Sequence, residues 1–157
     1  MQNRVLHFDH AGRLLFVSTN LVVDAGREYL MDMVIGNKPQ ATLSYFSIGN
    51  GGADPSNPLL PVAPQASDTD LYSLISLGPD YPGGGYRKPL QDVTKVDPHT
   101  VLCELVIDEN DGPSELFSYN EAGLYLYDGS NFILYARTTF PTTWKYKTRV
   151  LHWYVYF

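Results

Sequence analysis

Residues 120–140 read NEAGLYLYDGSNFILYARTTF, and this stretch decides the fold class. Gly123–Tyr127 and Phe132–Thr139 are rich in the aromatic and apolar residues that are typical of β-strands. Between them stands Asp128-Gly129, a dipeptide that favours tight hairpin turns because glycine readily adopts positive φ. The stretch therefore predicts an antiparallel β-hairpin.

Strand patterns continue on both sides of this hairpin. The predicted strands are Thr42–Ile48, Tyr86–Val96, Thr100–Ile107, Leu116–Tyr119 and Tyr146–Phe157, while Leu71–Leu77 is undecided between helix and strand. In the last strand, Leu151, Trp153, Val155 and Phe157 alternate onto one face. With 13 glycines, 11 prolines, 12 tyrosines and only 18% charged residues, the composition also favours many turns and a mainly β fold.

The strongest helix pattern covers residues 18–36. Ser18, Thr19 and Asn20 are each suitable N-caps for the apolar stripe that follows. Gly36 is suited to a left-handed C-cap, and Pro39 prevents the helix from continuing. We expect one amphipathic helix over about residues 20–35, packed on the sheet of a single domain that spans residues 18–157. Residues 1–17 are expected to form an N-terminal arm or a first strand.

A long loop is predicted from Gly49 to Asp70, because it contains four prolines and three glycines. Regular structure is not expected there, and positive φ is expected at Gly49, Gly51 and Gly52, where the preceding strand ends. Loops of this length in compact domains are normally functional, flexible or ordered by a partner. We expect a neighbouring chain to order both this loop and the N-terminal arm.

Charge is distributed unevenly along the chain, whose net charge is −6. Residues 92–128 contain nine acidic residues and one lysine, whereas residues 129–157 contain four basic residues and no acidic ones. Two surfaces of opposite sign would suit contacts between copies of the chain. Alternatively, the basic and acidic strands lie side by side and their charges cancel within one chain.

Several kinds of chemistry have no support in the sequence. Gly49–Asp54 departs from a dinucleotide-binding fingerprint at its last position, and no helix pattern follows it. The single cysteine, Cys103, excludes an intramolecular disulfide and is expected to be a small buried residue. His7 and His10 have no recognised zinc spacing. We expect no catalytic residue, cofactor or metal, no direct nucleic-acid binding, and no membrane-spanning or signal segment.

An ordered series of short motifs goes beyond a generic β protein. It comprises NLVVDAGREYLMDMVIG (20–36), SYFSIGNGG (44–52), DTDL (68–71), NEAGLY (120–125), the Asp128-Gly129 turn, RTTF (137–140), the lysines at 145 and 147, and the closing strand 151–157. Over roughly residues 20–157, this order resembles tail-associated structural proteins of double-stranded DNA bacteriophages, especially attachment domains of tail-fibre, collar-fibre and baseplate-type proteins. The chain stops where many fibre proteins continue into shaft and tip domains.

The resemblance implies an antiparallel, β-sandwich-like domain with one packed helix. It implies a structural component of a virion, assembled in the host cytoplasm, that connects or decorates the tail, collar or baseplate and anchors fibres. The expected partners are copies of the same chain, in a ring or fibre socket, and other tail, collar, baseplate or fibre proteins. The candidate interchain-contact residues are Gly49, Asn50, Gly51, Pro55, Pro58, Leu59, Leu60, Pro61, Lys145, Lys147 and Arg149.

The abundant aromatic residues leave a second function open. Aromatic rings that alternate along strands can form a flat platform on which sugars stack. The residues that would form it are Tyr125, Tyr127, Tyr135, Trp144 and Trp153. The alternative function is therefore a carbohydrate-binding module that recognises a receptor.

Overall fold

The computed structural model describes residues 3–157. Nine strands form one antiparallel sheet in the order β6-β3-β9-β10-β2-β1-β11-β8-β7, and β4 pairs only with β5. The elements are β1 (Arg4–Phe8), β2 (Leu14–Val22), α1 (Asp24–Val34), β3 (Thr42–Gly49), β4 (Ala53–Asp54), β5 (Asn57–Pro61), β6 (Lys88–Pro89), β7 (Asp92–Asp97), β8 (Thr100–Ile107), β9 (Leu116–Tyr127), β10 (Phe132–Tyr146) and β11 (Arg149–Tyr156).

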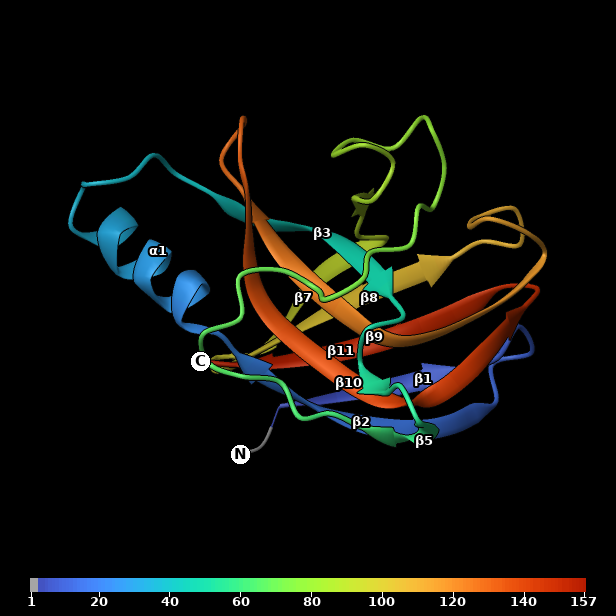
Figure 1. The fold of residues 1–157 in the computed structure, drawn as a ribbon. Helices are drawn as coiled ribbons and strands as arrows, with labels where there is room; N and C mark the ends of the chain where they lie inside the picture. Colours follow the sequence, from blue (N-terminus) through green and yellow to red (C-terminus); the bar gives the residue numbers. More distant parts are fainter. Residues whose placement is uncertain (1–2) are drawn as a thin grey trace.

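The sheet curls around its own core, as Figure 1 shows. The strand β2 joins its two halves, because residues 14–19 pair with β1 and residues 20–22 pair with β10. One apolar cluster contains Phe46 and Leu124 from one half together with Leu105 and Trp153 from the other. The mainly β, antiparallel class is thus confirmed, while the sandwich-like arrangement is not.

The hairpin over residues 120–140 is confirmed. Phe132 pairs with Tyr127 across a short turn, and Gly129 has a φ of 97°. The Asp128 carboxylate accepts backbone hydrogen bonds from Ser130 and Asn131 at 2.9 and 2.7 Å. These hydrogen bonds lower the pKa of Asp128 to about 2, so its charge stabilises the turn at neutral pH.

The predicted helix starts too early. Residues 18–22 belong to β2, and α1 begins at Asp24 with no side-chain cap at its N-terminus. Ser18, the first predicted cap, instead hydrogen-bonds His7 and Thr138 across the sheet. Pairing with the neighbouring strands therefore outweighs the capping preference of residues 18–20. The predicted C-cap is confirmed, because Gly36 has a φ of 81° and follows the last turn.

The N-terminal segment forms strands within the sheet. The first of them, β1, lies between β2 and β11, and its second residue, Val5, is completely buried. Of the two alternatives for residues 1–17, an arm or a first strand, residues 4–8 form a first strand. Residues 1 and 2 lie outside the described residues. This segment finds its partners within its own chain.

The last strand alternates as expected over most of its length. Leu151, Trp153 and Val155 are buried in the core. Phe157 lies beyond β11 and is 65% exposed, so it does not continue this buried face. The undecided segment 71–77 is neither helix nor strand, apart from one bridge between Leu74 and Gly49.

The core also contains a buried histidine. The His7 ring stacks on Phe16 at 4.1 Å between centroids and meets the edge of Phe140 at 4.7 Å. Its Nε2 lies 2.9 Å from the Ser18 hydroxyl oxygen. Burial, assisted by the positive charge of Arg149, lowers the pKa of His7 to about 3. His7 is therefore neutral in the folded chain at all but strongly acidic pH.

This burial makes folding stability depend on pH. Below pH 6.5 the unfolded chain binds a proton at His7 that the folded chain does not bind until about pH 3. The free energy of unfolding should therefore fall by up to about 1.4 kcal/mol per pH unit from this group as pH decreases through that window. Urea titrations of the wild type and His7→Phe between pH 7.5 and 5 measure the difference. Parallel curves for the two proteins would contradict the assignment.

Candidate functional site

The segment after β3 is more ordered than expected. Instead of an irregular loop, residues 53–61 form a small hairpin from β4 and β5, and β5 packs against β10. The hydrogen bond from Val62 N–H to Gly52 O, at 2.8 Å, closes this hairpin. The expectation that the loop lacks partners within its own chain is therefore wrong.

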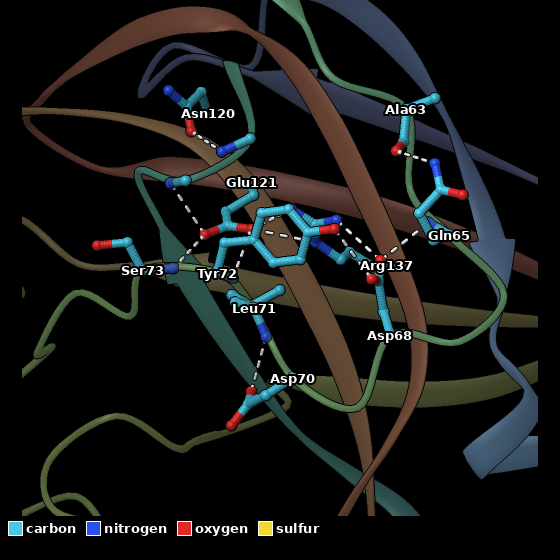
Figure 2. A network of polar contacts seen from close by, with 12 residues as sticks. Ala63, Gln65, Asp68, Asp70, Leu71, Tyr72, Ser73, Asn120, Glu121 and Arg137 are labelled. Atoms are coloured by element: carbon cyan, nitrogen blue, oxygen red, sulfur yellow. Dashed lines mark hydrogen bonds and ion pairs between the residues drawn. The ribbon is translucent and has the colours of Figure 1, made fainter. Parts of the chain in front are cut away.

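A carboxylate on β9 fixes both ends of this segment. Glu121 is completely buried. Its Oε1 accepts hydrogen bonds from the backbone N–H groups of Gly51 and Ser73, both at 3.0 Å, and its Oε2 accepts one from Tyr72 N–H at 3.2 Å. One side chain thus binds residues that precede and residues that follow the hairpin (Figure 2).

An arginine on β10 completes this buried group. The Arg137 guanidinium donates to Glu121 Oε2 from Nε at 3.1 Å and from Nη2 at 2.7 Å, and to Asp68 Oδ2 from Nη1 at 2.8 Å. The ring of Tyr72 covers the guanidinium at 4.0 Å (Figure 2). Burial alone would lower the pKa of Arg137, but the hydrogen bonds and charges of Glu121 and Asp68 outweigh it and raise that pKa.

The glycines of this segment serve a different purpose from the one predicted. Positive φ does not occur at Gly49, Gly51 or Gly52. A Cβ on Gly49 would come within 2.4 Å of Glu121 Oε1, and one on Gly52 within 2.3 Å of the Asn120 carbonyl oxygen. Glycine is required because the backbone approaches β9 too closely for any side chain.

A second ion pair, between Arg87 and Asp70, fixes the chain beyond the first cluster. Arg87 Nη2 lies 2.9 Å from Asp70 Oδ2, and the hydroxyl of Tyr125 donates to the same carboxylate. The guanidinium stacks over the Tyr125 ring at 4.1 Å, and its Nη1 donates to Ser47 Oγ at 2.9 Å. Burial alone would raise the pKa of Asp70, but Arg87 and Tyr125 together lower it. Asp70 therefore remains charged.

A third cluster joins β6 to the turn after β8. Lys88 Nζ forms ion pairs with Asp108 at 2.7 Å and with the buried Asp111. The same Asp111 accepts a hydrogen bond from the Tyr81 hydroxyl at 2.7 Å. Lys145 lies close by, completely buried, and donates to the backbone oxygens of Glu109 and Asp111. The second and third clusters attach residues 70–88 to the curled sheet.

These clusters bear on the two charge alternatives. Arg137 pairs with Glu121 in the adjacent strand, and His152 lies 3.1 Å from Glu104 across β11 and β8. Arg137, a basic residue of the last segment, thus meets an acidic residue of the preceding segment within a single chain. Cancellation across neighbouring strands accounts for this pair.

An open cavity of about 600 Å³ lies beside the first cluster. From the segment after β3 it is lined by Asn50, Gly51, Ala53, Asp54, Pro55, Pro58, Val62, Tyr72 and Ser73, and from β9 and β10 by Ser118, Asn120 and Thr142. Asn120 supports its floor, since its side chain accepts a hydrogen bond from Gly52 N–H at 2.6 Å and donates to Thr142 Oγ1 at 3.1 Å. The volume is within the range of small-ligand sites.

The predicted contact residues fall into four groups. Asn50, Gly51, Pro55 and Pro58 line the cavity. Leu59, Leu60 and Pro61 are exposed on β5, with the two leucines 71% and 53% exposed. Lys147, with a φ of 58°, lies in the turn between β10 and β11, and Arg149 is the first residue of β11. Gly49 and Lys145 are buried, so a neighbouring chain would not reach them without rearrangement.

The aromatic platform is not formed by the predicted residues. Tyr125, Tyr135 and Trp153 are buried, because the curled sheet places their rings inside the protein. Tyr127 is half-buried against Tyr45 and Phe132. Of the five, Trp144 alone is exposed, at 57%.

The single cysteine matches its sequence-based interpretation. Cys103 is completely buried, as predicted, and burial raises the pKa of its thiol to about 12. In residues 3–157, His, Cys, Asp and Glu side chains form no group of three or more suited to a metal ion. Over the same range, no helix has the length and apolar character needed to cross a membrane.

Comparison of the chain with protein families, with curated proteins and with solved structures gave no match.

The Glu121–Arg137–Asp68 cluster was not anticipated from the sequence. The local pattern places Glu121 in the hairpin stretch 120–140 without a partner, although Glu and Arg are rarely buried in a strand unless they are paired. Arg137 stands in a similar context, between Ala136 and Thr138. The sequence carries no signal for the third member, because Asp68 lies 69 positions from Arg137.

Removing the arginine should leave a buried carboxylate without its counter-charge. Arg137→Met should therefore reduce the free energy of unfolding by about 3–5 kcal/mol, measured by urea denaturation. The matched control is Arg13→Met, which removes an ion pair with Asp9 from a side chain that is 79% exposed and should have a much smaller effect. Equal losses in the two variants would contradict a special role for the buried cluster.

Proposed function

We propose that this chain is a structural subunit of a bacteriophage virion. It connects or decorates the tail, collar or baseplate through protein–protein contacts, associates with copies of itself in a ring or fibre socket, and anchors fibres. The same proposal includes a sandwich-like arrangement, in which the two halves of the curled sheet pack on each other. The motif order between residues 20 and 157 is the basis for the attribution to a phage tail.

The observation that carries the assembly role is the exposed β4–β5 hairpin. Leu59 and Leu60 are exposed, although the hairpin is held in place by the hydrogen bond from Gly52 N–H to Asn120 on β9 and by packing of β5 against β10. The prolines at positions 58 and 61 restrict its backbone further. A rigid segment that exposes apolar side chains loses little conformational entropy when it binds, which favours an interface with another copy.

A second exposed apolar surface lies on α1. Met31, Val34 and Ile35 are 62%, 81% and 68% exposed, and with Leu30 they line an apolar depression. The opposite side of the helix packs on the sheet, where Gly26 lies against Tyr135. Figure 1 shows α1 well separated from β5. Two separate apolar surfaces on one chain suit a ring, in which each subunit contacts two neighbours.

Introducing a charge at the hairpin should disrupt self-association. Leu60→Glu should convert an oligomer seen by mass photometry at micromolar concentration into monomer, because the carboxylate would be buried without a partner. The control is Leu116→Glu, which changes a leucine of the same 53% exposure on β9 and should leave the oligomer intact. A wild-type chain that is monomeric at these concentrations would contradict the proposed assembly.

The attribution to a phage tail has its own test. Genes for tail tube, sheath or fibre proteins are expected beside the gene for this chain, and the chain is expected among the proteins of the purified particle. Absence of the chain from purified particles would contradict a virion location, whatever its oligomeric state.

A further inference from the structure

The cavity beside the Glu121 cluster contains polar groups that the fold leaves unused. Within residues 3–157, the side chains of Asn50, Ser73 and Ser118 have no hydrogen-bond partner, and all three line this cavity. The hydroxyl of Thr142 accepts from Asn120, so its own hydrogen is available as a donor. An amide and three hydroxyls therefore converge on one open space.

One aromatic ring lines the same space, and a second lies beside one of its lining residues. Tyr72 lines the cavity and is 57% exposed, and Arg137 beneath it fixes its orientation. Trp144 pairs directly with Ser118 across β9 and β10, so the two side chains project from the same face of the sheet. The next residue, Lys145, is completely buried and points to the opposite face. Trp144 does not line the cavity itself, but it lies beside Ser118, which does, and its side chain is exposed.

The charge of the cavity limits what it can bind. Among the lining residues Asp54 is the one carboxylate, and no lysine or arginine is present. Asp54 is also held in the charged form, since hydrogen bonds from Ser56 lower its pKa. A phosphate, sulfate or acidic sugar would meet a negative charge without a compensating cation. The site therefore suits a neutral ligand with many hydroxyl groups and apolar C–H faces.

We propose that this cavity binds a neutral pyranose of a glycan, with Trp144 stacking on the sugar ring and Asn50, Ser73 and Ser118 hydrogen-bonding its hydroxyls. Sugars present one face of C–H groups and a rim of hydroxyls, which matches an aromatic ring next to uncharged polar side chains. This binding site goes beyond the proposed assembly role and does not depend on it. It also differs from the predicted platform, of which it retains only Trp144.

The chain provides a convenient optical reporter for this site. Trp144 is 57% exposed and Trp153 is completely buried, so iodide should quench the fluorescence of Trp144 alone. The probes are methyl glycosides of glucose, galactose, mannose and N-acetylglucosamine, with the methyl glycoside of N-acetylneuraminic acid as the acidic probe. At least one neutral probe should protect Trp144 from iodide and give saturation-transfer NMR signals, with a Kd of about 1 mM.

Variants separate this site from the rest of the surface. Trp144→Ala should weaken binding about tenfold, measured by saturation-transfer NMR, and Ser118→Ala should also weaken it. Tyr146→Ala changes a residue of the same 57% exposure on β10, two positions further from the cavity, and should bind like the wild type. Thermal unfolding of each variant verifies that the fold is retained.

Three results would overturn the proposal. The first is that no neutral probe binds up to about 50 mM, which is far above the expected Kd. The second is that Trp144→Ala binds the neutral probe as tightly as the wild type. The third is that the acidic probe binds as tightly as the neutral probes or more tightly. None of them bears on self-association, which mass photometry measures independently.

Discussion

The structure depends on one buried ion pair, between Glu121 on β9 and Arg137 on β10. These side chains are completely buried, yet between them they hydrogen-bond the backbone at Gly51, Tyr72 and Ser73 and the carboxylate of Asp68. Burying two charges costs free energy that only complete hydrogen bonding offsets, so the pair specifies one arrangement of the chain around it. The hairpin, the cavity and the exposed leucines all take their positions from that arrangement.

This constraint explains why a segment rich in proline and glycine is ordered within a single chain. A loop of such composition cannot bury enough apolar surface to compensate for its lost entropy. Here polar anchors replace the apolar ones, and glycines allow the backbone to approach within reach of Glu121. The outer side of the hairpin then remains free to expose Leu59 and Leu60.

Local patterns in the sequence predicted much of the fold and little of the site. The hairpin at Asp128-Gly129 and the buried face of β11 follow from turn chemistry and alternation, which act over a few residues. The predicted start of the helix is wrong, because strand pairing by residues 18–22 outweighs their capping preference. The Asp68–Arg137 contact and the cavity depend on how the sheet curls, which no local pattern records.

Amide hydrogen exchange on the isolated chain, at a concentration where it is monomeric, tests the central claim most directly. We predict that the N–H groups of Gly51, Tyr72 and Ser73, which donate to Glu121, exchange as slowly as those of β9. Exchange of these three amides at the rates of an unstructured peptide, with β9 still protected, would show that the segment is not ordered by its own chain and would contradict the claim.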